Sequence, residues 1–137
     1  MVGYSGAPLV KKLGIRPGDA IALLDRPPDW TIDRLPEDVT VCARARGPLD
    51  VIVAFFDRRA KLQRRLAVLI AALDPDGSLW IAWPRKAAGH VSDISENSLR
   101  ELVLPRGLVD VKVAALDEDW SALKFVLRKE LRPRRAR

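Results

Sequence analysis

The chain has 137 residues, a net charge of +6 and a pI near 10.0. Its only cysteine, Cys42, and only histidine, His90, exclude a disulfide framework and a clustered Cys/His zinc site, so we expect no metal. The sequence shows no secretory signal and no run of eighteen apolar residues, which predicts a cytoplasmic protein with no membrane partner.

Most of the positive charge lies at the C-terminus. Residues 128–137 carry six basic side chains against one acidic side chain, which accounts for five of the six net charges. We predict one compact domain over residues 1–128 and a basic, disordered tail over residues 129–137. A tail of this kind adds weak, salt-sensitive attraction to nucleic acid. We do not expect nucleic-acid binding elsewhere, because the rest of the chain is nearly neutral.

The N-terminal part predicts a short helix and two strands. Residues 8–13 favour a helix, with Pro8 in its first turn and Gly14 just past its end. The apolar run 19–24 predicts a central strand, and the prolines that follow exclude an immediate helix. One helical turn fits residues 31–35. Residues 39–43 predict a second strand, after a connection close to the minimum for a parallel crossover.

The middle of the chain predicts a βαβ unit. Residues 50–56 form a continuous apolar run that is typical of a strand buried on both faces. From Ala60, leucines recur on one helical face. Residues 74–77 predict a turn that ends this helix, and residues 79–83 predict a second buried strand. We expect the two strands to lie side by side and to run in the same direction.

The C-terminal part predicts a helix and a hairpin. Ser95 is the expected N-cap of a helix that ends at residues 105–107. Residues 108–116 alternate, with three valines on one side of a strand, and residues 123–127 alternate again. The short connection requires antiparallel pairing. The fold class is therefore α/β: a Rossmann-like three-layer domain with a mixed, mainly parallel sheet of about six strands that ends in an antiparallel hairpin.

Ligands of open α/β sheets bind beyond the carboxyl ends of the parallel strands. Three segments leave such ends: residues 25–30, 57–59 and 83–93. The ligand-binding candidates in and next to them are Asp25, Asp57, Arg58, Arg59, Trp83, Arg85, Lys86 and Asp93. No catalytic residue is identified.

Two alternatives stay open at these positions. Arg58 and Arg59 begin a helix and could hold phosphate or carboxylate together with free N–H groups. Alternatively, Asp57 caps the helix while both arginines extend into solvent. Arg85 and Lys86 could clamp a ligand, or they could belong to a solvated loop.

The usual cofactor and catalytic motifs are missing. A dinucleotide fold needs glycines after its first strand, where this chain has Asp25-Arg26-Pro27-Pro28. The second strand is followed by Arg44 and Arg46 instead of an acid that binds ribose hydroxyls. No Walker A, H-E-x-x-H or G-x-S-x-G sequence is present. We therefore predict no cofactor.

The order of βαβ unit, helix and antiparallel hairpin resembles the carboxyl half of the S-adenosylmethionine-dependent methyltransferase fold. The chain departs from that family at the cofactor loop, at the ribose acid, and after Phe56, where the Asn/Asp-Pro-Pro-aromatic motif is missing. Five segments also resemble a small uncharacterised bacterial family, classed as a domain of unknown function. They are Gly3-Tyr4-Ser5-Gly6, Lys11-Lys12-Leu13-Gly14, Trp83-Pro84-Arg85-Lys86, residues 108–112 and residues 120–126.

The main prediction is a domain that binds an anionic small molecule or a protein partner and lacks an intact S-adenosylmethionine site. This reading favours a role other than catalysis. The first alternative is a small S-adenosylmethionine-dependent methyltransferase with an atypical cofactor site, covered by a lid that contains Tyr4, Ser5, Lys11 and Lys12. The second is weak nucleic-acid binding through residues 128–137.

Overall fold

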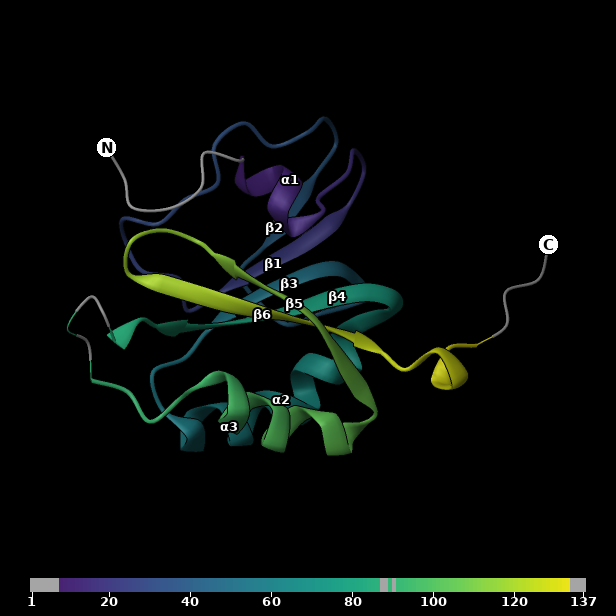
Figure 1. Cartoon of the computed structure of the whole chain (residues 1–137). Helices are drawn as coiled ribbons and strands as arrows, with labels where there is room; N and C mark the ends of the chain where they lie inside the picture. The colour runs from purple at the N-terminus through teal and green to yellow at the C-terminus, as the bar shows by residue number, and fades with distance from the viewer. Residues whose placement is uncertain (1–7, 87–88, 90, 134–137) are drawn as a thin grey trace.

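The computed structural model describes residues 8–86, 89 and 91–133. Its centre is one sheet of six strands in the order β2-β1-β3-β4-β6-β5 (Figure 1). The strands are β1 (Ala20–Leu24), β2 (Thr40–Cys42), β3 (Leu49–Phe55), β4 (Leu73–Pro84), β5 (Leu108–Ala115) and β6 (Trp120–Leu127). The helices are α1 (Leu9–Leu13), α2 (Arg59–Ala72) and α3 (Glu96–Val103), with 3₁₀ turns η2 (Leu104–Arg106) and η3 (Lys129–Leu131).

The strand directions confirm the predicted fold class. Strands β2, β1, β3 and β4 pair in parallel, while β6 pairs antiparallel with both β4 and β5. Ile52 of β3 aligns with Leu79 of β4, so the two apolar runs of the βαβ unit lie side by side and point the same way. The result is a mixed, mainly parallel sheet with helices on its faces.

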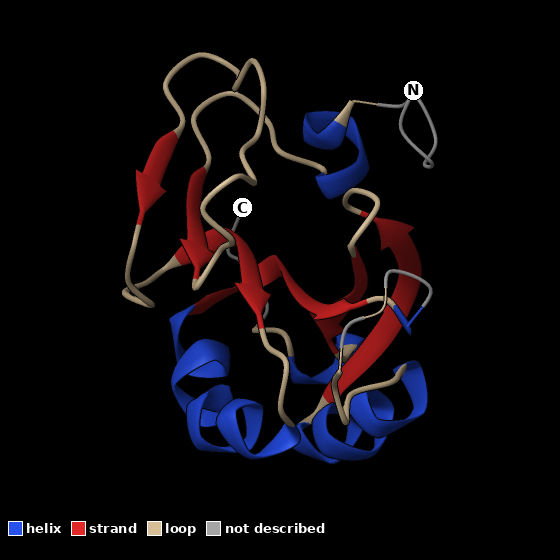
Figure 2. Cartoon of the chain, turned by 90° about the vertical axis from the view of Figure 1, so that its left-hand side faces the viewer, coloured by secondary structure: helices blue, strands red, loops and turns tan. Residues whose placement is uncertain are grey.

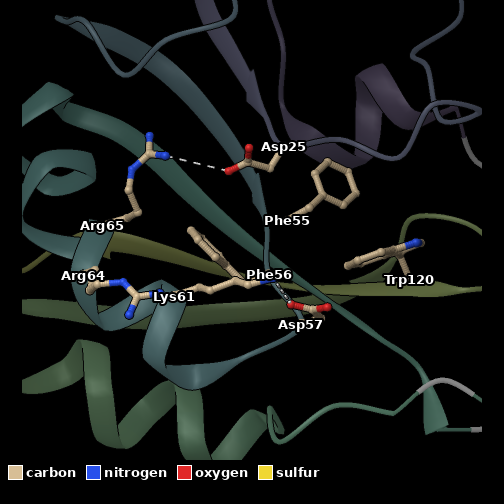
Figure 3. Close-up of a pocket in the computed structure, with 8 residues that line it drawn as sticks. All are labelled: Asp25, Phe55, Phe56, Asp57, Lys61, Arg64, Arg65 and Trp120. Carbon is tan, nitrogen blue, oxygen red and sulfur yellow. Dashed lines mark hydrogen bonds and ion pairs between the residues drawn. The ribbon is translucent and has the colours of Figure 1, made fainter.

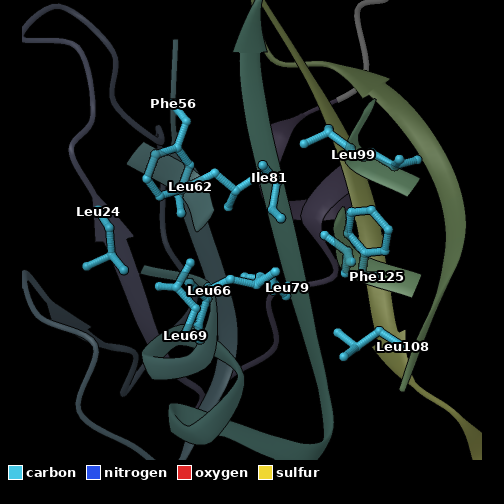
Figure 4. Packing of buried hydrophobic residues seen from close by; sticks show 14 of the residues in the cluster. Leu24, Phe56, Leu62, Leu66, Leu69, Leu79, Ile81, Leu99, Leu108 and Phe125 are labelled. Carbon is cyan, nitrogen blue, oxygen red and sulfur yellow. The ribbon is translucent and has the colours of Figure 1, made fainter. Parts of the chain in front are cut away.

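Helices α2 and α3 lie together on one face of the sheet, and α1 lies on the other face with long loops (Figures 1 and 2). Leucines of α2 and α3 pack on apolar side chains of β3, β4 and β6 (Figure 4). The fully buried members include Leu62, Leu66, Leu69, Leu99, Ile52, Leu79, Ile81 and Phe125. Burying each such side chain contributes about 1.5–3 kcal/mol relative to exposure, and this apolar stripe fixes α2 against β3 and β4.

The opposite face has a thinner cover. Leu13 of α1 packs there with Trp30 and Ile32 from the connection between β1 and β2, against Val53 and Trp80 of the sheet. The predicted helical turn over residues 31–35 is wrong, because the structure has no helix there. Trp30 and Ile32 are buried instead, so this connection covers the sheet as an irregular loop.

The junction between α2 and β4 also differs from the prediction. Residues 74–77 do not form a separate turn, since β4 already begins at Leu73, directly after α2. The pairing of β3 with β4 is irregular between Leu49 and Val51. A Cβ at Gly77 would come within 2.8 Å of the Asp50 carbonyl oxygen, so only glycine lets the two backbones approach here.

The start of α3 confirms the predicted cap. The Ser95 hydroxyl accepts the Ser98 N–H at 3.2 Å, and the Ser98 hydroxyl accepts the Ser95 N–H at 2.8 Å. This reciprocal arrangement satisfies two N–H groups that a helix start leaves without partners. The helix ends through η2 at Gly107, whose φ of 94° is the left-handed conformation that glycine adopts readily.

The valines of β5 do not share one side of the strand, so that prediction is wrong. Leu108 packs in the cluster under α2 and α3, whereas Ala114 packs against the opposite cluster. Residues six positions apart would face the same side of a regular strand. The register shift between Asp110 and Lys112 reverses the alternation. A bulge on an edge strand also disfavours pairing with another chain.

The chain continues past residue 128 into η3, where the Arg132 Nε donates to the Leu127 carbonyl oxygen at 2.9 Å. Residues 134–137 of the predicted tail lie outside the described residues, as do Tyr4 and Ser5 of the predicted lid. No helix in the described part of the chain is long and apolar enough to cross a membrane.

Candidate functional site

A pocket of about 510 Å³ lies at the carboxyl ends of β1 and β3. The connection that leaves β1 crosses to the face of α1, whereas the chain that leaves β3 enters α2 on the opposite face. This divergence is the topological switch point at which open α/β sheets bind ligands. The pocket is lined by Asp25, Phe55, Phe56, Asp57, Lys61, Arg64, Arg65 and Trp120 (Figure 3).

Asp25 follows the last residue of β1 and has a φ of 56°, the left-handed conformation. The loop then curls back, because the Trp30 N–H donates to the Pro27 carbonyl oxygen at 3.0 Å and the Arg26 Nη1 donates to the Trp30 carbonyl oxygen at 2.7 Å. The chain thus makes a sharp turn at this position without a glycine, and the turn presents a carboxylate to the pocket.

Asp57 is held by the first turn of α2. Its Oδ1 accepts from the Lys61 Nζ at 3.0 Å, four residues later on the helix. This hydrogen bond lowers the pKa of Asp57, and the positive charges of Lys61 and Arg58 act in the same direction. The Ser92 hydroxyl donates to the Asp57 carbonyl oxygen at 2.8 Å and fixes the backbone. Asp57 is therefore an ionised, positioned carboxylate at neutral pH.

Aromatic rings form one wall of the pocket. The Phe55 ring meets the Trp30 ring edge-on at a centroid distance of 4.9 Å and the Trp120 ring at 5.1 Å. Phe56, the next residue, packs on the opposite side in the core under α2. Because Phe55 and Trp30 are almost completely buried, this wall closes one side of the pocket to water.

Helix α2 supplies the positive charge of the pocket. The carboxylate of Asp25 lies 3.8 Å from the Arg65 Nη1, and Lys61 pairs with Asp57. Arg64 lies on the same side of the helix, and no ion pair or hydrogen bond involves its side chain within the described residues. The Asp25–Arg65 pair is largely exposed, and such pairs contribute little stability, so both groups are available to a ligand.

The structure separates the residues that the sequence singled out. Asp25 and Asp57 line the switch-point pocket together. Trp83 and Lys86 line a different pocket of about 420 Å³ beside the start of α3. The Arg85 Nη1 donates to the Glu118 carbonyl oxygen at 3.1 Å, which ties Arg85 to the turn between β5 and β6.

The remaining candidates stabilise the chain around α2 and α1. Asp93 caps α2, because its Oδ1 accepts the Arg59 N–H at 2.8 Å. The Arg59 guanidinium lies 3.6 Å from the Glu101 carboxylate of α3, and Arg58 is the N-cap residue without a side-chain cap bond. The Lys12 Nζ donates to the Ala115 carbonyl oxygen at 3.0 Å, whereas Lys11 is exposed.

Sequence reasoning missed most of the pocket lining. Lys61, Arg64 and Arg65 come from the first two turns of α2, and Trp120 comes from a strand that is distant in sequence. The spacing of Asp57 and Lys61 is the available signal, since residues four apart meet on a helix surface. Arg64 and Arg65 follow three and four residues later and continue the same face.

The chain was compared with protein families, curated proteins and solved structures, and only solved structures are similar to it. No family model matches the chain, and no curated protein matches its sequence. A TehB-like SAM-dependent methyltransferase from Corynebacterium glutamicum is similar over 87% of this chain and 85% of its own, with a TM-score of 0.55 and 13% identity. Here SAM is S-adenosylmethionine.

Two further solved structures are similar to the same extent. Magnesium protoporphyrin IX methyltransferase from Synechocystis, with bound SAH (S-adenosylhomocysteine), is similar over 88% of this chain and 78% of its own, with a TM-score of 0.55 and 10% identity. Ribosomal protein L11 methylase from Lactobacillus delbrueckii is similar over 87% and 74%, with a TM-score of 0.54 and 10% identity. The chain therefore has the Rossmann-like fold of SAM-dependent methyltransferases.

These likenesses correct two predictions. The expectation of a domain without a SAM site, and with no cofactor, is wrong: the structural neighbours favour the alternative of a SAM-dependent methyltransferase. The physical reason for the error lies at Asp25. The prediction of no cofactor depended on the missing glycines after β1, yet Asp25 at that position adopts the left-handed conformation that glycine supplies.

The pocket lining also fits SAM chemically. SAM carries a carboxylate, an ammonium group, a sulfonium and an adenine ring. The pocket offers the Asp25 and Asp57 carboxylates for positive groups, the Arg64 guanidinium for the carboxylate, and aromatic rings for the base. Its volume is within the range of about 300–1,000 Å³ typical of small-molecule sites. The lining has no acid from the end of β2, where Arg44 follows Cys42 and Ala43.

Proposed function

We propose that this protein is a SAM-dependent methyltransferase whose cofactor binds in the switch-point pocket between β1 and β3. The observation that carries the proposal is the position of that pocket, at the divergence of two connections in a sheet of the methyltransferase type. The named activities of the similar structures support it by analogy of fold.

Four side chains would hold the cofactor. Asp25 faces the pocket from the end of β1 and would accept hydrogen bonds from the ammonium group. Arg64 would pair with the carboxylate of SAM, because it is the pocket arginine without a described partner. Arg65 would also pair with that carboxylate, because its 3.8 Å contact with Asp25 is long enough to exchange for a ligand. Trp120 would contact the adenine or the sulfonium through its ring.

Bound SAM supplies a methyl group activated by the adjacent positive sulfur. The protein has to orient the acceptor and keep water away. Asp57 is ionised, so its carboxylate would accept a hydrogen bond from the acceptor's N–H or O–H group and hold that proton as the acceptor reacts. The wall made by Phe55 and Trp30 excludes water from the cofactor side.

Calorimetric titration with SAM and with SAH tests the proposal. We expect micromolar binding of both, and at least about ten-fold weaker binding after Asp25→Ala or Arg64→Ala, which corresponds to about 1.4 kcal/mol. Arg59→Ala is the matched control, because Arg59 belongs to the same helix but pairs with Glu101 outside the pocket. If wild-type protein shows no heat of binding with either molecule at millimolar concentration, the proposal fails.

Other expectations from the sequence remain proposals. The segment matches at residues 3–6 and 83–86 support kinship with the uncharacterised bacterial family. The suggested lid over the site also remains a proposal, and two of its residues, Lys11 and Lys12, lie in α1. A cytoplasmic location and weak nucleic-acid binding through residues 128–137 are still predictions. Truncation after residue 131, followed by duplex binding at two salt concentrations, tests the last of these.

A further inference from the structure

A second pocket, of about 410 Å³, lies at the opposite edge of the sheet, where β1 and β3 begin. We call it the amino-edge pocket. Its lining is strongly polar and includes Asp19, Asp50, Ser78 and Lys124. None of these residues lines the switch-point pocket, so the two cavities are separate. Its volume is within the range of about 300–1,000 Å³ in which proteins hold small ligands.

Ser78 lies in the floor of the amino-edge pocket. It belongs to β4, aligns with Val51 of β3, and is only 8% exposed. Its hydroxyl makes no hydrogen bond to any described residue, although it faces this cavity. The Ser78 hydroxyl is therefore open to a hydrogen bond with a ligand in this cavity.

One corner of the amino-edge pocket is negative. The Asp19 Oδ2 accepts the Arg16 N–H at 2.9 Å, and the Asp50 Oδ2 accepts the Ala20 N–H at 2.8 Å. Because Ala20 directly follows Asp19, the two carboxylates lie at the same corner. Both are fixed in orientation by backbone donors, and neither forms an ion pair with a described residue. An ammonium group would complete this corner.

Lys124 supplies positive charge elsewhere in the same cavity. Its Nζ lies 5.9 Å from the centre of the Trp80 ring and pairs with no described carboxylate, although four aspartates share the lining. Partial burial, followed by the positive charge of Lys112, lowers the pKa of Lys124. A ligand carboxylate next to Lys124 would stabilise the charged ammonium group and so oppose both causes of the lowered pKa. Within the described residues, Lys124 therefore forms no ion pair with Asp19 or Asp50, although all three line this cavity.

We propose that the amino-edge pocket binds a small zwitterion of the amino-acid class. The ammonium group lies between Asp19 and Asp50, the carboxylate pairs with Lys124, and the Ser78 hydroxyl donates to the ligand between them. A ligand with only one of the two charges leaves either the carboxylate corner or the lysine without a counter-charge. This proposal is independent of the methyltransferase activity.

The test is a titration of the full ¹⁵N-labelled chain followed by amide chemical shifts. The probes are three zwitterions, glycine, γ-aminobutyrate and ε-aminocaproate, in which the distance between the ammonium and carboxylate groups increases. Putrescine, which has only ammonium groups, and butyrate, which has only a carboxylate, are the controls. We expect saturable shifts at Ser78 and Lys124 with at least one of the three zwitterions. Putrescine and butyrate should bind at least about ten-fold more weakly, as expected when one charged contact is lost.

Variants separate the site from a general charge effect. Lys124→Met and Asp50→Asn should each weaken binding of the best zwitterion at least about ten-fold. Lys11→Met is the control: Lys11 is exposed on α1, two residues before the Leu13 of the lining, but does not itself line the cavity, so affinity should change less than about two-fold. If Asp50→Asn has a lower melting temperature than the wild-type protein, Asp19→Asn is used in its place.

Three results would overturn the proposal. They are the absence of saturable shifts with all three zwitterions at millimolar concentration, binding of putrescine or butyrate as tight as that of the best zwitterion, and equal loss of affinity in the Lys11→Met control. Since the readout is local to the amino-edge pocket, a failure of SAM to bind between β1 and β3 would leave this result unaffected.

Discussion

Replacing Phe55 by alanine tests the aromatic wall of the switch-point pocket. Phe55 is 3% exposed, and its ring lies between the Trp30 and Trp120 rings, with centroid distances of 4.9 and 5.1 Å. Truncating a buried phenylalanine to alanine costs about 3–5 kcal/mol, because apolar contacts are lost and a cavity is left. We expect Phe55→Ala to lower the free energy of unfolding by that amount.

Phe55→Leu divides this cost into two parts. Leucine keeps most of the buried apolar volume but removes both edge-on aromatic contacts. Each such contact contributes about 0.5–1.5 kcal/mol beyond burial, so Phe55→Leu should cost about 1–3 kcal/mol. The ordering of wild type, leucine variant and alanine variant is the specific prediction, because a generic apolar site would tolerate leucine with little loss.

Equilibrium urea unfolding followed by tryptophan fluorescence is the appropriate assay, since Trp30 and Trp120 lie against Phe55. With a urea m-value of about 2 kcal/mol/M, the midpoint of Phe55→Ala should fall by roughly 2 M. Val68→Ala, at a 51% exposed position of α2, is the control and should change stability by less than about 0.5 kcal/mol. A loss below about 1 kcal/mol in Phe55→Ala would refute the aromatic wall.

Two further predictions concern α2 and α3. Because Lys61 and the neighbouring charges lower the pKa of Asp57 from 3.8, the stability that Asp57 contributes is complete above the unfolded pKa and is lost as the pH falls below 3.8 through the folded pKa. Asp57→Asn should therefore reduce the acid sensitivity of unfolding, and an unchanged pH profile of the melting temperature would contradict this. Ser95→Ala removes the α3 cap and should cost about 0.5–2 kcal/mol in urea unfolding, whereas unchanged stability would show that the cap is not formed in solution.

The central βαβ unit could be predicted because its signal is local. Residues 51–56 and 79–83 are continuous apolar runs, and only a strand covered on both faces buries such a run completely. The helix between them shows its buried leucines at helical spacing. The cap at Ser95 is local as well, since the donor and the acceptor are three residues apart.

The pocket could not be predicted to the same degree, because long-range packing assembles it. Phe55 contacts Trp30 and Trp120, which come from opposite ends of the chain, and no local pattern relates these three residues. The turn at Asp25 uses a left-handed conformation that a search for glycine does not find. The reversal of alternation in β5 depends on its register with β6, which a single strand does not encode.

The central claim is that the cavity between β1 and β3 is a SAM site, and amide mapping with SAH tests it most directly. Titration of the ¹⁵N-labelled chain should give saturable shifts concentrated at residues 25–30 and 55–58, where the pocket lining leaves the sheet, with little change at Ser78 on the opposite edge. Saturable shifts centred on another part of the molecule, or no shifts at millimolar SAH, would contradict the account.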